Sequence, residues 1–301
     1  MFTAANGYDG PGVGIGNGVF SIGTYGSWNT IWSDTSEAEM HTHTDGWESW
    51  FQANFPNTER FLYLIDESLD YPQTQQWASW VENNPGVGSQ LPTFATIDLT
   101  HAIDSVPSLD IAASWFTVGI TDDWENAYDS SNADPEKDFW FYNSKRPSTG
   151  SFMTEDDGVA LRQLMWCKYK KRISRWFFWE GTYYNNFFGG QGETNVFETA
   201  LTFGSCCTPH PVLGETGWNH SNGDGVMFYP GTDSIYKSES YDINGPLASL
   251  RLKHWRRGIQ DEDYMTLAAA IDNQATDQIV HRMVPKVFWD YGVQNEADPS
   301  Y

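Results

Sequence analysis

Residues 61–68 read FLYLIDES, a run of five apolar side chains that leads directly into Asp66 and Glu67. A dense apolar run of this length, ended by charged residues, predicts a buried strand. Along the rest of the chain, short apolar runs alternate with longer amphipathic segments. This alternation is typical of βα units and a parallel sheet, and it disfavours a β-sandwich. The sequence therefore predicts an α/β fold.

The predicted strands and helices follow one another in regular order. Strands are expected at 19–23, 61–65, 92–97, 109–115, 138–142 and 176–179. Helices are expected at 36–55, at 74–83, through 161–169, and from 247 to about 271. Residues 181–225 are rich in Gly, Asn and Thr and predict a long loop, ended by a short strand at 226–229. A loop of this length suggests a functional role.

These elements make about six βα units, whereas a closed (β/α)8 barrel has eight. We therefore expect residues 1–272 to be the C-terminal portion of a (β/α)8 TIM-barrel-like domain that lacks its first βα units in this chain. Residues 273–301 would form a C-terminal extension that packs on the barrel. An open six-stranded sheet is the alternative architecture.

The charge of the chain restricts its partners. Seventeen basic residues against 40 acidic ones give a formal net charge of −23. This charge repels phosphate backbones and anionic lipid surfaces, so nucleic acid is not an expected partner. It suits a neutral substrate, and a solvated acidic surface explains it equally well. No apolar run approaches the roughly 18 residues of a membrane span, and the first twenty residues lack the pattern of a signal peptide.

Aromatic residues make up 16% of the chain, with 15 Trp. Flat apolar rings with a polar edge pack on the C–H faces of sugars, and Tyr and Trp donors reach sugar hydroxyls. We expect most of these rings to lie in the core and some to face a ligand.

Several other patterns predict no cofactor or metal. The glycines of PGVGIGNG (11–18) precede a strand, whereas a dinucleotide fingerprint follows a strand and opens a helix. The cysteines Cys167, Cys206 and Cys207 form no CxxC pair, and their odd number defines no disulfide framework. The acidic stretch 129–138 lacks the spacing and glycine of a calcium loop.

Asp66 and Glu67 follow the strand at the point where a barrel strand delivers side chains to its C-terminal rim, where barrel active sites lie. Two carboxylates in different environments are what glycosidic cleavage needs. One stays protonated to donate to the leaving oxygen, and the other stays ionised to stabilise developing positive charge. A helix N-cap beside a solvated acid is the alternative interpretation.

Four segments carry a family resemblance: FLYLIDES (61–68), FWFYNSKRP (139–147), NGDGVMFYPG (222–231) and LASLRLKHWRRGIQDEDYMTLA (247–268). In this order they resemble glycoside hydrolase family 123 and its broader relatives, over most of residues 6–272. The resemblance implies a barrel domain and a retaining β-N-acetylgalactosaminidase. It also implies substrate-assisted catalysis, in which the 2-acetamido oxygen of the sugar attacks the anomeric carbon.

The resemblance also implies roles for individual residues. Asp66 would orient the acetamido group, and Glu67 would act as general acid and then as general base. Ser68 departs from the family pattern, because proline usually follows this pair. The residues that would line the sugar site are Tyr142, Asn143, Trp179, Asp224 and Tyr229. Arg251 and Arg256 are expected to stabilise the barrel through contacts with carboxylates.

The implied partner is a glycan or glycoconjugate, together with the missing N-terminal segment or another subunit. The family's N-terminal β-sandwich and first barrel strands have no counterpart here, so this fragment could be inactive. Export is suggested by the resemblance alone. Two alternatives remain open. One is a non-catalytic carbohydrate-binding or cell-surface protein, and the other is a glycosidase that pairs Glu67 with Asp224.

Overall fold

The computed structural model describes residues 18–23, 36–114, 137–143, 152–154, 156–184, 195–198, 201–204, 219–223 and 225–287. Six strands within these ranges form one sheet in chain order: β1 (Val19–Ile22), β2 (Glu59–Asp66), β3 (Thr93–Thr96), β4 (Ile111–Ser114), β5 (Asp138–Tyr142) and β6 (Trp176–Phe177). The pairs β1–β2, β2–β3, β3–β4 and β5–β6 are parallel. Parallel strands in chain order are compatible with part of a (β/α) barrel.

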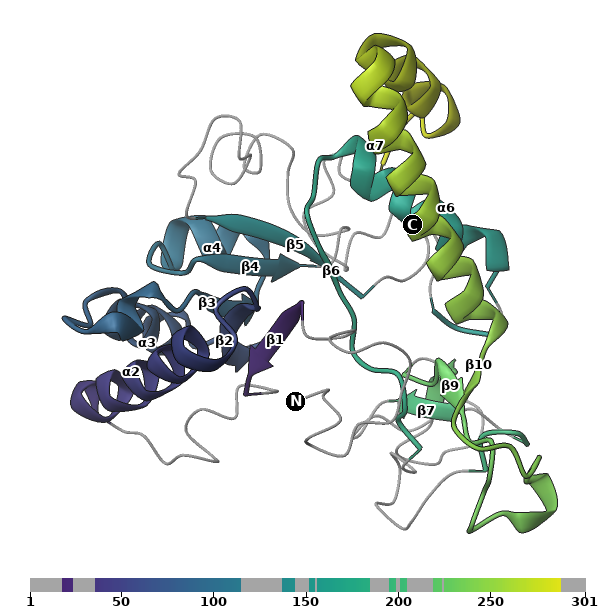
Figure 1. Ribbon diagram of the computed structural model, residues 1–301, viewed down its shortest axis with the longest axis horizontal. Coiled ribbons are helices and arrows are strands. Elements are labelled where there is room, and N and C mark those ends of the chain that lie inside the picture. Colours follow the sequence, from purple (N-terminus) through teal and green to yellow (C-terminus); the bar gives the residue numbers. More distant parts are fainter. Residues whose placement is uncertain are drawn as a thin grey trace. The chain divides into compact units, whose positions relative to one another are not determined.

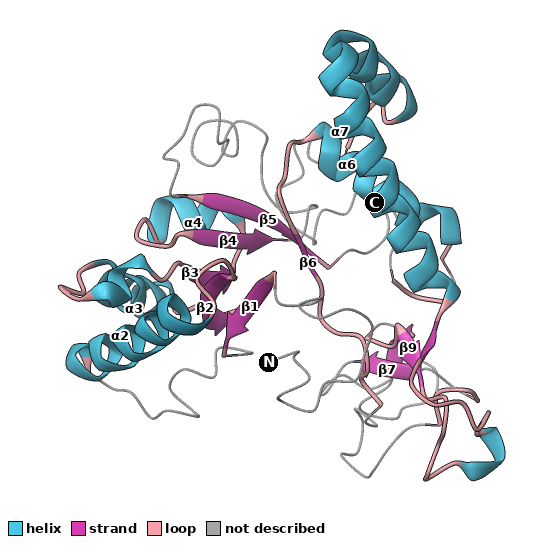
Figure 2. Ribbon diagram, in the orientation of Figure 1, coloured by secondary structure: helices cyan, strands magenta, loops and turns pink. Residues whose placement is uncertain are grey.

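Helices lie between β1 and β2, β2 and β3, β3 and β4, and β5 and β6 (Figures 1 and 2). They are α2 (Glu37–Asn54), α3 (Tyr71–Glu82), α4 (Leu99–Ser105) and α6 (Gly158–Lys170), and α7 (Leu250–Met283) follows near the end of the chain. The predicted α/β class and parallel sheet are confirmed, and the closed eightfold barrel stays a prediction. Helix α4 was not expected, because a seven-residue helix is too short to show clear apolar periodicity.

The chain divides into two compact units. Unit 1 comprises Met1–Ser114 and Val118–Trp140, and unit 2 comprises Trp115–Thr117 and Phe141–Tyr301. Strands β1–β4 and the first part of β5 therefore belong to unit 1. The end of β5, β6, α6 and α7 belong to unit 2.

Each of the five helices begins at a side chain that caps it. The N-cap residues are Ser36, Asp70, Asp98, Asp157 and Ser249, and the side chain of each accepts a hydrogen bond from a backbone N–H of the first turn. Ser36 and Glu39 form a reciprocal capping box. These short polar residues satisfy donors that the helix itself leaves unpaired, so the helix starts are fixed locally.

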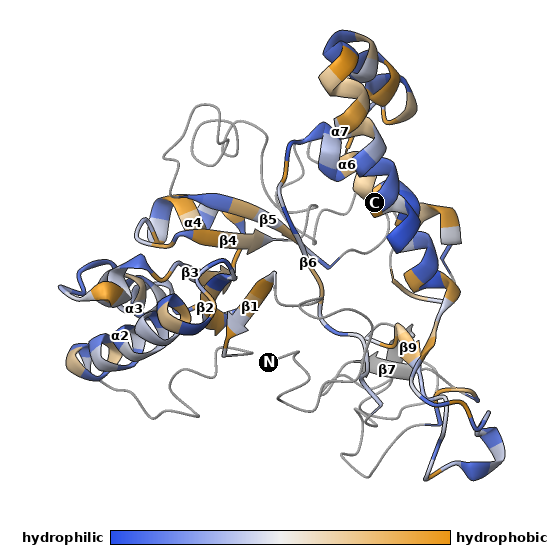
Figure 3. Cartoon of the chain, in the orientation of Figure 1, coloured by the Kyte–Doolittle hydropathy of each residue, from blue (hydrophilic) through white to orange (hydrophobic). Residues whose placement is uncertain are grey.

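Apolar residues concentrate along the strands, whereas much of α2 and α7 is hydrophilic (Figure 3). On β2, Leu62 and Leu64 are fully buried. Their neighbours Phe61 and Tyr63 each contact Phe94 of β3, with ring centroids 4.9 and 4.8 Å apart. Trp140 of β5 lies 5.0 Å from Phe61 in an edge-to-face arrangement. One face of the sheet in unit 1 is thus an aromatic layer.

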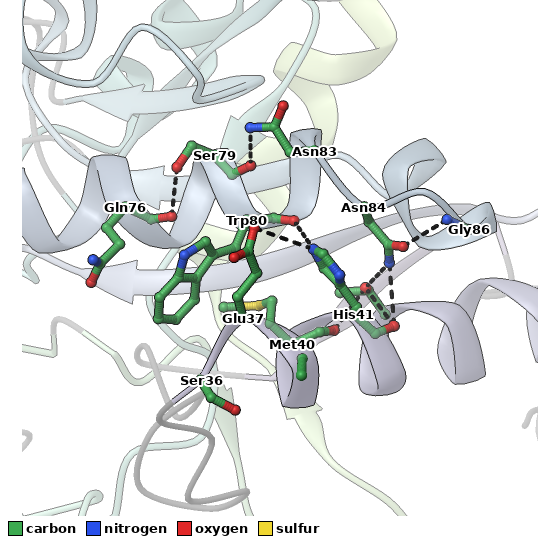
Figure 4. A network of polar contacts seen from close by, with 12 residues as sticks. Ser36, Glu37, Met40, His41, Gln76, Ser79, Trp80, Asn83, Asn84 and Gly86 are labelled. Carbon is green, nitrogen blue, oxygen red and sulfur yellow. Dashed lines mark hydrogen bonds and ion pairs between the residues drawn. The ribbon is translucent and has the colours of Figure 1, made fainter.

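A polar network joins α2 to the end of α3 and the turn that follows it (Figure 4). His41 Nε2 lies 2.8 Å from the carbonyl oxygen of Trp80. Asn84 donates through Nδ2 to the His41 carbonyl, to Thr44 Oγ1 and to Asp45 Oδ1. Its Oδ1 accepts from the backbone N–H of Gly86. The buried Asn84 therefore pairs groups that would otherwise be desolvated without partners.

In unit 2, α6 packs closely against α7. A Cβ built on Gly258 would lie 2.7 Å from the carbonyl oxygen of Arg162, so only glycine allows this approach. Asp261 accepts hydrogen bonds from Arg162 and Trp166, and Lys168 pairs with Glu262. The small residue and the ion pairs together fix the two helices side by side.

Helix α7 is interrupted at Asp272, whose backbone is not helical. This kink agrees with the predicted end of the helix near Ile271. Beyond it, Thr276 and Val280 are buried, and Lys170 Nζ donates to the carbonyls of Val284 and Pro285. The expected extension at 273–301 stays a prediction.

The region predicted as a loop contains short strands. Strands β7 (Leu201–Gly204) and β8 (Asn219–Asn222) pair antiparallel, as do β9 (Phe228–Tyr229) and β10 (Leu247–Ala248). Two 3-10 helices, η2 (Val87–Gln90) and η3 (Lys237–Glu239), complete the described elements. None of the helices in the described ranges has the length and apolar character needed to cross a membrane.

Candidate active site

A bulge in β2 decides where Asp66 points. The register pairs Tyr63 with Phe94 and Ile65 with Ala95, so β2 has one more residue than β3 between these pairs. Side chains alternate along a regular strand, and without the bulge Asp66 would share the face of Leu62 and Leu64. The extra residue reverses this alternation. Asp66 therefore pairs with Thr96 and shares the face of Tyr63.

Two hydroxyl groups hold the Asp66 carboxylate. Oδ1 accepts a hydrogen bond from the Tyr63 hydroxyl and another, of 2.7 Å, from Thr96 Oγ1. Both of these donors are neutral. Within the described part of the chain, Asp66 accepts these hydrogen bonds through Oδ1. Its Oδ2 can therefore accept a hydrogen bond from a ligand.

Thr96 also fixes the next residue. The backbone N–H of Glu67 donates to Thr96 Oγ1 over 2.6 Å, so one hydroxyl joins the two acidic residues. Thr96 is 3% exposed, and its side chain is therefore held firmly by the surrounding core. The end of β3 thus orients the end of β2.

Glu67 adopts a strained backbone conformation. Its φ is +44°, in the left-handed region that residues with a side chain rarely occupy. This conformation costs on the order of 1 kcal/mol for a residue other than glycine. The side chain of Glu67 is exposed, whereas Asp66 is half-buried. The two adjacent carboxylates therefore have different surroundings.

Tyr63 stays a hydrogen-bond donor at every working pH. Burial raises the pKa of its hydroxyl far above the ordinary value, and the negative charges of Asp66 and Glu67 raise it further. A protonated phenol is the form that donates to a carboxylate. Tyr63 is therefore a hydrogen-bond donor to Asp66 Oδ1.

The predicted sugar-site residues Tyr142, Asn143 and Trp179 lie together in unit 2. Asn143 follows β5 directly and has a φ of +43°, the same position and conformation that Glu67 has after β2. Its side-chain Oδ1 accepts from the backbone N–H of Trp179 over 2.8 Å. Tyr142 is 6% exposed, and its ring centroid lies 6.0 Å from that of Phe177.

Trp179 is half-buried and lies against a glycine turn. Its ring is 5.1 Å from that of Tyr183. A Cβ on Gly225 would lie 2.9 Å from the Trp179 ring, and Gly225 has a φ of +75°. Tyr229, also half-buried, packs its ring 5.4 Å from Phe197. Asp224 lies outside the described residues.

The six predicted site residues that the structure describes fall into two groups. Asp66 and Glu67 belong to unit 1, and Tyr142, Asn143, Trp179 and Tyr229 belong to unit 2. Tyr63 and Thr96 were not predicted. The sequence indicated the role of Tyr63 only weakly, since a ring with a hydroxyl group lies three residues before Asp66. It did not indicate the role of Thr96, because that role depends on the pairing of β2 with β3.

The expectation for Arg251 and Arg256 needs correction. Arg251 is buried, and it donates to backbone carbonyls instead of carboxylates: those of Phe152, Gly223 and Val226. Arg256 is exposed. The prediction failed because the five donors of a guanidinium can also bind several backbone carbonyls, which the sequence does not show.

Comparisons with known proteins give limited information. No family model matches the chain, and no curated protein matches it. A solved family 123 glycoside hydrolase from Clostridium perfringens, described for glycolipid glycan hydrolysis, is similar with a TM-score of 0.48 and 12% identity. The similarity covers 82% of this chain and 38% of that chain. A likeness of this size assigns no residue roles, so the candidate site rests on the contacts described above.

Proposed function

We propose that this chain is part of a retaining glycoside hydrolase that removes terminal β-linked N-acetylhexosamine, with N-acetylgalactosamine as the first substrate to test. The observation that best supports this proposal is the arrangement of Asp66 and Glu67. Asp66 ends β2 and Glu67 follows it, the two residues differ in exposure, and Thr96 Oγ1 donates to the Asp66 carboxylate and accepts from the backbone N–H of Glu67. Structural acids at a strand end do not require a left-handed glutamate, and the strain at Glu67 therefore favours a functional role.

In the proposed reaction, the acetamido oxygen of the substrate attacks the anomeric carbon and displaces the leaving group. Asp66 Oδ2 would accept the acetamido N–H and stabilise the positive charge that develops on this group. Neutral donors hold Asp66 through Oδ1, so its negative charge remains available for that purpose.

Glu67 would supply the proton transfers. As an acid it protonates the leaving oxygen. As a base it then takes a proton from the water that opens the cyclic intermediate, and this restores the protonated acid. Its exposed side chain is accessible to a substrate and to water.

The proposal extends to the fold and the sugar site. The six strands would form part of a (β/α)8 barrel. The residues that would line the glycan site are Tyr142, Asn143, Trp179, Asp224 and Tyr229. Glycan residues would stack on the ring of Trp179, which is half-buried and lies against Gly225.

The test uses a chromogenic β-N-acetylgalactosaminide and the matching glucosaminide, with the plain galactoside as control. Glu67→Gln should lower kcat by about 10²–10⁴-fold and leave sugar binding intact. Glu59→Gln, at the opposite end of β2, is the matched control and should retain full activity. Unchanged turnover in Glu67→Gln would refute the role of Glu67, and cleavage of the plain galactoside would refute acetamido participation.

A non-catalytic carbohydrate-binding protein on the same fold is the second candidate. The half-buried rings of Trp179, Tyr183 and Tyr229 favour it independently of the carboxylates. Saturable binding of N-acetylgalactosamine without any hydrolysis would support this candidate over the enzyme.

A further inference from the structure

We propose that Arg251 is a positioning residue that holds the Gly223–Tyr229 turn in the conformation needed to present Trp179 and Tyr229 to a glycan. This inference rests on the proposed function and concerns only unit 2. It begins from the buried guanidinium, which is 8% exposed.

The guanidinium reaches the turn at several points. Nη1 donates to the carbonyl of Gly223 and also to that of Phe152, and Nη2 donates to the carbonyl of Val226. The Tyr229 hydroxyl lies 3.5 Å from Nη2. A planar group with several fixed donors can hold carbonyls that point in different directions, and the ammonium of a lysine cannot reproduce that arrangement.

The residues that precede Arg251 also bind the same turn. Leu247 and Ala248 of β10 pair with Tyr229 and Phe228 of β9. The next residue, Ser249, donates its backbone N–H to the Met227 carbonyl and caps α7 with its side chain. Strands β9 and β10 lie side by side (Figure 1). Leu247, Ala248, Ser249 and Arg251 together contact each position from Val226 to Tyr229.

The opposite side of the turn carries the aromatic residues. The backbone N–H of Tyr183 donates to the Gly225 carbonyl over 2.9 Å, and Thr182 forms a β-bridge with Val226. Gly225 lies directly against the Trp179 ring. A displacement of the turn would therefore displace the rings of Trp179 and Tyr183.

The two glycines of the turn make this arrangement possible. Gly223 and Gly225 have φ values of +83° and +75°. A Cβ on Gly223 would lie 2.9 Å from both terminal nitrogens of Arg251 and 2.7 Å from Thr154 Cγ2. Gly223→Ala therefore disturbs the same contact from the side of the turn.

The experiment compares Arg251→Lys and Gly223→Ala with Arg256→Lys, a control on the exposed side of α7. With the chromogenic N-acetylgalactosaminide, both test variants should raise KM about tenfold, since a small misplacement of binding groups weakens substrate binding strongly. The pH profile of kcat should not change, because Glu67 is untouched. In hydrogen exchange, the amides of 225–229 should exchange at least tenfold faster, while those of α6 keep their rates.

Other results would overturn the inference. A KM within twofold of the wild type, with faster exchange in the turn, would make Arg251 a structural residue only. Equal acceleration of exchange in α6 would indicate general destabilisation. If the wild type cleaves no glycoside, the proposed enzyme fails, and calorimetric binding of N-acetylgalactosamine decides instead. Tenfold weaker binding in both variants supports the role of Arg251, and unchanged or undetectable binding refutes it.

Discussion

Thr96 connects the two acidic residues, so its hydroxyl can be removed as a direct test of the site. Valine has nearly the same shape as threonine, and Thr96→Val therefore deletes the hydroxyl without opening a cavity. The substitution removes a hydrogen bond to the Asp66 carboxylate and leaves the N–H of Glu67 without its acceptor.

The expected cost follows from these two contacts. A hydrogen bond to a charged acceptor contributes about 1.5–3 kcal/mol, and a neutral one about 0.5–1.5 kcal/mol. Thr96 is 3% exposed, so water cannot easily replace the lost hydroxyl. We expect Thr96→Val to lower the free energy of unfolding by about 2–4 kcal/mol. Because Asp66 loses a fixed donor, kcat should also fall.

Urea unfolding, followed by tryptophan fluorescence, measures the free energy, and the chromogenic glycoside assay measures kcat. Thr96→Ser keeps the hydroxyl and is the control, with a loss below about 1 kcal/mol. A double-mutant cycle with Asp66→Asn should give a coupling energy of about 1–3 kcal/mol. A loss below about 0.5 kcal/mol in Thr96→Val, or a coupling near zero, would show that the hydroxyl does not organise the pair.

Two further predictions concern stability. Burial alone would raise the pKa of Asp261, but hydrogen bonds from Arg162 and Trp166 and the charge of Arg162 outweigh it and lower that pKa. A lowered pKa gives stability that is present above the unfolded pKa of about 4 and lost as the pH falls through the folded one. The melting temperature of Asp261→Asn should therefore fall less than that of the wild type as the pH is lowered from about 5 to about 2. In the control Asp263→Asn, where the replaced residue is exposed, the melting temperature should depend on pH as in the wild type. Asn84→Ala should lower the free energy of unfolding in urea by about 2–3 kcal/mol, because the Gly86 N–H loses its acceptor and the Asp45 carboxylate loses one donor. An equal loss in the control Asn83→Ala, where the replaced residue is exposed, would contradict this explanation.

Local sequence patterns determined most of the elements. The short runs at Phe61–Ile65 and Phe139–Tyr142 specified strands, because apolar runs of roughly 4–8 residues that are rich in aromatic and branched side chains and are bounded by polar residues are typical of buried strands. Ser36 specified a helix start through hydrogen bonds within one turn. The helix predicted from residue 74 begins earlier, at Tyr71, after the N-cap Asp70. The acidic pair was placed at a strand end by adjacency alone. All of these signals depend on residues that are close in the sequence.

Tertiary structure decided the arrangement of the site. Alternation along β2 would place Asp66 on the face of Leu64, and the bulge against β3 reverses this. Thr96 became a partner of the pair only through strand pairing, and Arg251 found its carbonyl acceptors more than twenty residues away. Strand register and long-range packing select one arrangement among many that are equivalent locally. The residues next to a side chain in the sequence therefore do not predict its tertiary contacts.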